Sequence, residues 1–267
     1  MSFLHIVVLA VVQGITEFLP ISSSAHLVLL PVVTGWPDQG LMIDVAAHFG
    51  SLLAILAYFW RDVVRLAAGL YRLVAADRTD RDGRLALFIA IATLPAVAAG
   101  LVIKELAPGG IRSVELIGWT ATGFGVLLYL ADRYGPTERT MRDLGLGGAF
   151  LVGCAQAIAL LPGTSRSGIT MTAARALGLH RTEAARFSFL LSIPAVAGAS
   201  LLEGVELAAS GDDTLAWDAA LSAGLTFIAA LAAIAWLMRW LRTATFTPFV
   251  VYRIALGLGL LAWFYVA

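Results

Sequence analysis

The chain contains six uninterrupted apolar windows, each close to the length of about 20 residues that a helix needs to cross membrane hydrocarbon. They lie at about residues 41–60, 85–103, 114–131, 187–209, 219–238 and 248–267. The composition agrees, because 60% of the residues are hydrophobic and 13% are charged, against about 25% charged residues in soluble domains. We therefore expect an all-α integral membrane protein in which residues 1–267 form a single polytopic membrane domain.

The charge balance and the cysteine content exclude several classes of function. Eighteen Lys and Arg residues balance eighteen Asp and Glu residues, so there is no basic excess to bind nucleic acid. The single cysteine, Cys154, lies in an apolar run and can form neither an internal disulfide nor a zinc cluster. The first twenty residues lack the basic start and cleavage site of a signal peptide, so we expect them to remain in the mature protein.

Two further apolar stretches, residues 1–34 and 146–179, are interrupted near their centres. The interruptions read Pro20-Ile21-Ser22-Ser23-Ser24 and Pro162-Gly163-Thr164-Ser165-Arg166-Ser167-Gly168. Each half is too short to cross a membrane, and the backbone groups at such a break need protein or water partners. We therefore predict two re-entrant helical hairpins in addition to the six transmembrane helices.

Basic residues gather on one side of the predicted spans. The twelve arginines on this side are Arg61, Arg65, Arg72, Arg78, Arg81, Arg84, Arg133, Arg139, Arg142, Arg181, Arg239 and Arg242. The opposite loops contain Lys104 and Arg112 as basic residues, and the connection at 210–218 is acidic. Because Lys and Arg collect in cytoplasmic loops, the arginine side is predicted to face the cytoplasm and both termini the external face.

The two interrupted stretches resemble each other in sequence. Leu19–Ser23 aligns with Leu161–Ser165, and each segment follows an apolar helix that contains a glutamine. Further along, Ala46–Phe49 resembles Ala184–Phe187 at the start of the next span. Since the first hairpin enters from outside and the second from the cytoplasm, the two units form an inverted-topology repeat, whose shared site is expected near the bilayer midplane. The units cover about 1–131 and 146–267.

The first break carries a carboxylate, hydroxyl groups and a histidine. Gln13 and Glu17 are four residues apart, so they share one face of a helix that ends at or just before Pro20. The next helix begins with Ser22, Ser23 and Ser24. These serines are expected to cap that helix and leave free N–H groups that bind an anion, with His26 beside them as an acid or base. Gln13 points into the same break and is expected to contact the phosphate group as well.

The second break carries the cation. Arg166 is the one basic residue within either break, and an arginine at this depth is costly unless it has a function or a buried partner. Its planar guanidinium can bind two phosphate oxygens. The surrounding residues that we expect to contact a phosphate group, in part through their backbone, are Gly163, Thr164, Ser165, Ser167 and Gly168.

Each of these residues also has a purely structural explanation. The serines can serve only as helix caps, His26 can be an interior histidine, and Glu17 can be the ion-pair partner of Arg166. Together, a carboxylate, serines, a histidine and an arginine at tips that face one cavity are the groups that phosphoryl transfer requires. Weaker candidates are Asp44, His48, Glu183 and Arg186, which could pair across the repeat. Arg253 could snorkel or line the cavity.

At these positions the sequence resembles the undecaprenyl pyrophosphate phosphatase family, bacterial membrane enzymes also known as bacitracin-resistance proteins. The resemblance rests on Gln13–Leu27, which reads QGITEFLPISSSAHL, and on Pro162–Gly168, which reads PGTSRSG. The length, the number of spans and the repeat organisation are also similar, so the resemblance covers essentially the whole chain.

The resemblance implies hydrolysis of undecaprenyl pyrophosphate to undecaprenyl phosphate and inorganic phosphate. This reaction recycles the lipid carrier for peptidoglycan and other cell-wall polymers and confers resistance to bacitracin. The implied location is the bacterial cytoplasmic (inner) membrane, with an active site that opens to the external, periplasmic face. The partners are then the substrate and membrane lipid, and the sequence leaves open whether the chain forms a homodimer.

The resemblance also assigns roles to residues. The family's catalytic glutamate, serine, histidine and arginine correspond to Glu17, Ser23, His26 and Arg166. A divalent cation, Mg²⁺ or Ca²⁺, is the implied cofactor and would bridge Glu17 and the pyrophosphate. Gln13 is neutral where many members carry a second carboxylate, and Ala25 stands where glycine is frequent.

Two alternatives remain at the level of function and two at the level of mechanism. A lipid-carrier flippase or transporter fits because inverted repeats with broken helices are typical of transporters. A channel or structural protein would leave the polar residues of both breaks unexplained. For a phosphatase, either His26 takes a proton from Ser23, which attacks phosphorus, or His26 activates water. The spacing of these two residues favours serine attack.

Overall fold

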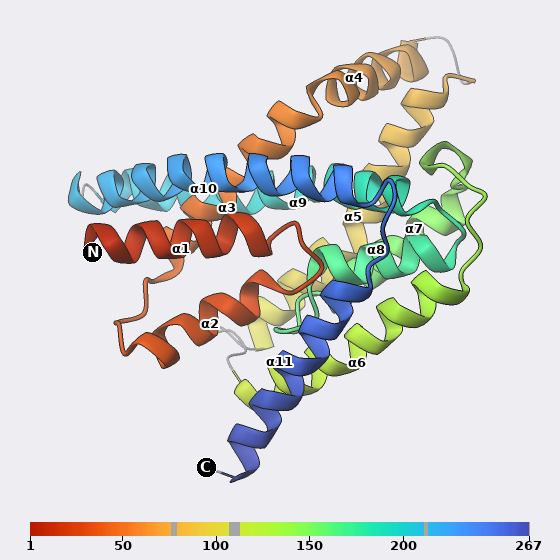
Figure 1. Cartoon of the computed structure of the whole chain (residues 1–267). Helices are drawn as coiled ribbons and strands as arrows, with labels where there is room; N and C mark the ends of the chain where they lie inside the picture. Colours follow the sequence, from red (N-terminus) through yellow and green to blue (C-terminus); the bar gives the residue numbers. More distant parts are fainter. Residues whose placement is uncertain (76–78, 107–112, 211–212, 267) are drawn as a thin grey trace.

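The computed structural model describes residues 1–75, 79–106, 113–210 and 213–266 (Figure 1). The helices of the first half are α1 (Phe3–Thr16), α2 (Ser23–Thr34), α3 (Leu41–Tyr58), α4 (Trp60–Ala75), α5 (Arg81–Leu106) and α6 (Val114–Tyr134). The short 3-10 helix η1 (Met141–Asp143) precedes α7 (Leu146–Ile158), α8 (Arg166–Ala176), α9 (Arg181–Ser210), α10 (Asp213–Trp240) and α11 (Thr247–Val266). These ranges contain no β-strand, which confirms the all-α prediction. Arg78 and Arg112 lie outside the described residues.

Four of the described helices are long and apolar enough to cross a membrane, namely α5, α6, α11 and residues Leu215–Trp240 of α10. They match four of the six predicted spans. The span predicted at 41–60 corresponds to α3, which passes this test together with α4, although the two helices are bent by 81° relative to each other. The span predicted at 187–209 lies within the single helix α9. The chain is therefore a multi-pass helical membrane protein.

Both interrupted stretches form pairs of short helices with the break where the sequence predicts it. Helix α1 ends at Thr16 and α2 begins at Ser23, so Pro20 lies between them. Helix α7 ends at Ile158 and α8 begins at Arg166. Proline has no N–H group to donate and disfavours a helical conformation in the preceding residue, which explains why neither helix continues through its break.

Ser22 and Ser165 hold the same place in the two breaks. Each is the N-cap of the second helix, and they are the two non-glycine residues with a positive φ in the described part of the chain, at 76° and 67°. The hydroxyl of Ser22 accepts a hydrogen bond from the N–H of Ala25, and that of Ser165 accepts one from the N–H of Gly168. The structure therefore matches Ser22 with Ser165. Alignment of Pro20 with Pro162 would instead match Ser22 with Thr164, so the two matches differ by one residue.

The helices that precede the breaks pack against long helices of the opposite half. Helix α1 lies along α10, and α7 lies along α5. Glycines permit both contacts, because a Cβ on Gly14 would lie 2.8 Å from the backbone nitrogen of Ala230, and one on Gly153 would clash with the backbone of Ala92. Helices α3 and α9 also contact each other, as do α6 and α11. The two halves are thus interleaved rather than placed side by side.

The arginine-rich loops gather at one end of the helices. Asp132, near the end of α6, accepts hydrogen bonds from Arg175 and Arg181 and from the backbone N–H of Phe246. Further ion pairs at this end join Arg142 to Asp82 and Arg186 to Asp62. These contacts bring together the loops that the sequence analysis assigns to one side of the membrane.

The opposite ends of the helices are joined by separate contacts. The amino group of Met1 binds Asp218 at 2.6 Å and so connects the start of α1 to the start of α10. The Tyr265 hydroxyl donates to Glu115, which connects the end of α11 to the start of α6. Met1 and Tyr265 therefore lie at the end away from the arginine-rich loops.

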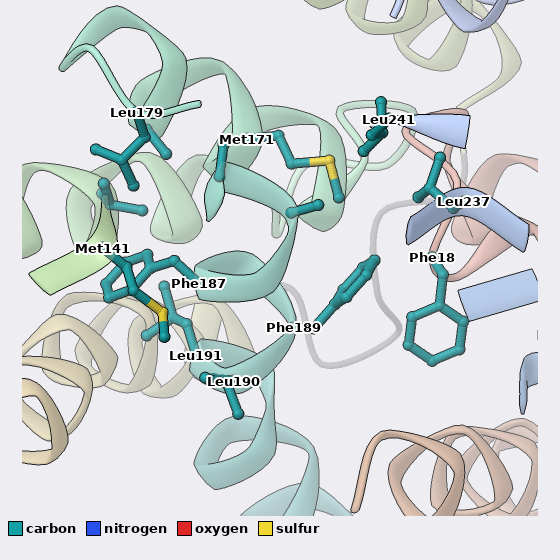
Figure 2. Close-up of a cluster of buried hydrophobic side chains, with 14 of the residues drawn as sticks. Phe18, Met141, Met171, Leu179, Phe187, Phe189, Leu190, Leu191, Leu237 and Leu241 are labelled. Atoms are coloured by element: carbon teal, nitrogen blue, oxygen red, sulfur yellow. The ribbon is translucent and has the colours of Figure 1, made fainter. Parts of the chain in front are cut away.

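A buried apolar cluster lies directly beside the first break. Phe18 packs edge-on against Phe189 of α9, with ring centroids 5.3 Å apart, and Leu237 of α10 belongs to the same cluster (Figure 2). Within a membrane such contacts stabilise the fold through close packing, since lipid is as apolar as the side chains. Because Phe18 follows Glu17 in the chain, this packing fixes the carboxylate at the end of α1.

Candidate active site

Glu17 is the acceptor around which the polar residues of the first break are arranged. Its side chain is 7% exposed. The Oε2 atom accepts hydrogen bonds from Gln13 Nε2 at 3.1 Å and from Ser23 Oγ at 2.7 Å. Gln13 reaches Glu17 because the two residues share one helical face, as the sequence predicts. Ser23 reaches the same atom because the chain reverses between α1 and α2.

Arg166 approaches the same carboxylate from the second break. As the first residue of α8, it donates from Nη2 to the Oε1 atom of Glu17. Its Nη1 atom is buried and has no hydrogen-bond partner within the described residues. The ion pair between Glu17 and Arg166, one of the two explanations of these residues, is therefore present, and one donor of the same guanidinium has no partner in the described residues.

His26 has partners other than Ser23. Its Nδ1 atom lies 2.7 Å from the carbonyl oxygen of Ser22, and because a carbonyl can only accept, Nδ1 carries the proton. Its Nε2 atom lies 2.7 Å from the hydroxyl of Tyr252, whose ring stacks on the imidazole. No hydrogen bond joins His26 to Ser23 in the described residues, so the predicted proton transfer between them is not supported by this geometry.

The other hydroxyl groups of the two breaks form matching pairs. The Oγ atoms of Ser22 and Ser24 are 3.2 Å apart, and those of Ser165 and Ser167 are 3.3 Å apart. Ser24 is exposed, whereas Ser167 is buried and donates to the Leu19 carbonyl at 3.1 Å. Ser22 and Ser165 therefore act as caps, Ser167 connects the breaks, and Ser24 is accessible to a ligand.

The glycines of the second break contact protein in this structure. Gly163 has a φ of +85°, and a Cβ there would lie 2.8 Å from backbone atoms of Ile117 on α6. At Gly168 a Cβ would lie 2.6 Å from Nη1 of Arg253. Close packing with α6 and α11 thus explains both glycines, where the sequence analysis expected close approach of a ligand. The buried Oγ1 atom of Thr164 has no partner in the described part of the chain.

Helix α11 contributes Tyr252, which the sequence does not single out, and Arg253, which the sequence marks only as a residue that could line the cavity. Tyr252 binds His26, and the fully buried Arg253 donates to backbone carbonyls of both breaks. Their signal in the sequence is weak, because Arg253 is a lone charge within an apolar span and Tyr252 has the neighbours of an ordinary span residue. Residues of α11 therefore join those of the two breaks in the candidate site.

His48 is a further neighbour of the central carboxylate. Its Nε2 atom lies 3.6 Å from Glu17 Oε2, while its Nδ1 lies 2.7 Å from the carbonyl oxygen of Asp44. The sequence analysis considered a pairing across the repeat for His48 and Arg186. Arg186 does pair across the two units, with Asp62, whereas His48 lies beside the candidate active site within the first unit.

The arrangement provides the groups that transfer a phosphoryl group. A hydroxyl bound to a carboxylate can act as a nucleophile that is activated by a base. A guanidinium with a free donor can bind and stabilise phosphoryl oxygens, and the N–H groups at a helix start do the same. Ser23, Glu17 and Arg166 bring these functions within one hydrogen-bonded group.

Comparison with known proteins points to the same chemistry. The family model for the bacitracin resistance protein BacA matches residues 6–259. The undecaprenyl-diphosphatase of Roseobacter denitrificans is 51% identical over 99% of this chain and 100% of the relative. The undecaprenyl-diphosphatase 1 of Rhodospirillum rubrum is 50% identical over 99% of this chain and 96% of the relative. An undecaprenyl-diphosphatase of Hahella chejuensis is 49% identical over the full length of both chains. The chain therefore belongs to the BacA family of bacitracin resistance proteins.

Proposed function

We propose that this protein hydrolyses undecaprenyl diphosphate to undecaprenyl phosphate and inorganic phosphate, and so recycles the lipid carrier for cell-wall synthesis. The relatives named undecaprenyl-diphosphatase match nearly the whole chain at about 50% identity. Resistance to bacitracin follows from the same reaction and agrees with the name of the family. The flippase alternative is not favoured, because these relatives are named for hydrolysis.

The structural observation that best supports the proposal is the unpartnered Nη1 donor of Arg166. Nη2 is bound to Glu17, while the buried Nη1 lacks a partner in the described residues. A phosphoryl oxygen at Nη1 would lie next to the carboxylate that holds the Ser23 hydroxyl. The diphosphate would therefore meet a cation and a nucleophile together, with the prenyl chain directed into the membrane.

We assign the attack on phosphorus to Ser23. Its hydroxyl donates to Glu17, so the carboxylate rather than His26 is the group that receives the serine proton. Attack on the terminal phosphorus forms a phosphoseryl group and expels undecaprenyl phosphate, and water then releases inorganic phosphate. Arg166 and the N–H groups at the start of α2 would stabilise the phosphoryl oxygens. His26, with Nε2 as its reactive atom, would exchange the proton of the leaving group or of water.

A divalent cation, Mg²⁺ or Ca²⁺, is the proposed cofactor. The described residues contain no group of three or more His, Cys, Asp or Glu side chains able to hold a metal ion. However, Gln13 Oε1 is buried beside Glu17 and lacks a partner there. Mg²⁺ is commonly held by one or two carboxylates together with substrate phosphates, so Glu17 and Gln13 fit as its protein ligands. A bound cation would neutralise charge on the diphosphate.

The proposed topology has six transmembrane spans and two re-entrant hairpins in inverted repeats of about 1–131 and 146–267. The interleaved packing and the equivalent caps Ser22 and Ser165 support it. Because the arginine-rich loops gather at one end, that end is assigned to the cytoplasm. Both termini and the opening of the site then face the periplasm from the inner membrane.

Release of inorganic phosphate from undecaprenyl diphosphate by the purified protein in detergent tests the proposed function. We expect multiple turnovers that stop when a chelator removes divalent cations. A protein that only moves the lipid between leaflets would release no phosphate in detergent. Arg166→Lys, purified in the same way, controls for a contaminating phosphatase, because its activity should be strongly reduced.

A further inference from the structure

Arg253 joins the two breaks through their backbones. Its side chain is fully buried. Nη2 donates to the carbonyl oxygens of Gly163 at 3.1 Å and Thr164 at 2.7 Å, and Nη1 donates to the carbonyl oxygen of Pro20 at 3.4 Å. A single guanidinium from α11 therefore binds both the break that precedes Ser23 and the break that precedes Arg166.

Backbone carbonyl groups and the absence of a side chain at Gly168 accommodate the buried guanidinium of Arg253. The described residues contain no ion pair to Arg253, so backbone carbonyls alone bind the cation. These carbonyls belong to segments between helices, where the backbone lacks helical partners. The absence of a Cβ at Gly168 leaves the room that Nη1 occupies. A buried charge is energetically costly in a membrane. A buried arginine between the two breaks therefore indicates a functional role in addition to packing.

We propose that Arg253 is a positioning residue that holds the two breaks in register, so that Ser23 and Arg166 both reach the carboxylate of Glu17. This inference rests on the proposed phosphatase function. The planar fork of an arginine directs donors toward two separate segments, whereas a lysine presents one compact ammonium group. Arg253 also fixes the adjacent Tyr252, which holds the ring of His26.

The test compares the kinetics of Arg253→Lys with those of wild-type protein. The substrate is undecaprenyl diphosphate in detergent, and the measured quantities are kcat, KM and the midpoint of thermal unfolding. Because a misplacement of about 1 Å can cost roughly 10²-fold in rate, we expect kcat to fall by about that factor. KM should change little, since Arg253 binds backbone carbonyls and not the diphosphate.

Arg175 offers a matched control. It is also fully buried and also donates to backbone carbonyls, including those of Gly135 and Pro136, but it lies at the arginine-rich end beside Asp132. Arg175→Lys should lower the unfolding midpoint and leave kcat of the folded protein close to the wild-type value. The contrast between the two variants separates positioning of the site from general stability.

Three outcomes decide the inference. A selective fall of kcat in Arg253→Lys supports it, whereas wild-type kcat in that variant overturns it. Equal losses of kcat and stability in Arg253→Lys and Arg175→Lys also overturn it, because Arg253 would then be an ordinary structural residue. If Arg253→Lys does not fold, Arg253→Gln is compared with Arg175→Gln under the same criteria. Failure of the wild-type protein to release phosphate would contradict the proposed function itself.

Discussion

Glu17 and Arg166 lie 149 residues apart in the sequence, yet their side chains form one ion pair across the two breaks. Replacement of Arg166 by lysine keeps the charge and removes the planar fork that binds Glu17 and a phosphoryl oxygen together. We expect phosphate release to fall by about 10²- to 10³-fold, the effect typical of losing one donor to a transition state. The measurement is kcat/KM of folded protein, and near wild-type turnover would reduce Arg166 to a structural partner.

Two substitutions test the role of the Glu17 carboxylate, one that removes this carboxylate and one that adds a second carboxylate beside it. Glu17→Gln should lose roughly 10²- to 10⁴-fold in kcat, because the proposed base and metal ligand is neutralised. Gln13→Glu should remain active, since a second carboxylate next to Glu17 adds a ligand for a divalent cation. Titration with Mg²⁺ and Ca²⁺ in chelator-treated protein should show tighter activation of Gln13→Glu. Activity that persists in excess chelator would show the metal assignment to be wrong.

The hydrogen bond from Ser23 to Glu17 predicts a covalent intermediate on serine. Rapid quenching of wild-type protein with substrate labelled in the terminal phosphate should leave label on Ser23. Glu17→Gln should suppress this labelling more strongly than His26→Ala, because Ser23 donates to the carboxylate and not to the imidazole. If Ser23→Ala retains a sizeable fraction of wild-type turnover, water activated by His26 becomes the better mechanism.

The contact between Tyr252 and His26 can be removed by deleting one oxygen atom. Tyr252→Phe keeps the stacked ring but takes the hydroxyl away from Nε2, so kcat should fall by about two- to tenfold, the worth of one hydrogen bond. Tyr265→Phe is the matched control. Tyr265 lies on α11 like Tyr252 but away from the site, and its hydroxyl is bonded to Glu115 of α6. Equal effects of the two substitutions would argue against a role of Tyr252 at His26.

The proposed orientation can be examined by labelling single cysteines in intact cells. In a Cys154→Ser background, Ser2→Cys should react with an impermeant reagent from outside, and Thr79→Cys should not. Thr79 precedes α5 at the arginine-rich end, whereas Ser2 precedes α1 at the opposite end. Labelling of Thr79→Cys from outside would show that the protein has the opposite orientation in the membrane. As a control, Thr79→Cys should react with the reagent after the cells are opened.

The sequence predicts those parts of the site that depend on near neighbours in the chain. The break at Pro20, the cap at Ser22 and the shared face of Gln13 and Glu17 follow from local rules and occur as expected. The three-residue spacing of Ser23 and His26 does not by itself reveal their partners. The His26 ring binds the Ser22 carbonyl, and the Ser23 hydroxyl donates to Glu17.

Partners that come from distant segments could not be predicted in this way. Tyr252 and His26 are 226 residues apart, and their contact depends on how α11 packs beside the first break. The one-residue shift between the two breaks has a similar origin, since the conformations of Ser22 and Ser165 define the match and the proline positions do not. Local sequence rules therefore locate the site, and helix packing decides which groups meet there.

The match of Ser22 with Ser165 pairs Ser23 with Arg166 and Glu17 with Leu160. Two breaks with equivalent caps thus supply opposite halves of the proposed reaction, the acid and hydroxyl from one and the cation from the other. Two copies of the first unit, assembled head to tail, would bring two glutamates together with no arginine between them. Two copies of the second would supply cations without a nucleophile. Repetition of the frame alone would not yield the proposed site, which depends on the differences between the two breaks.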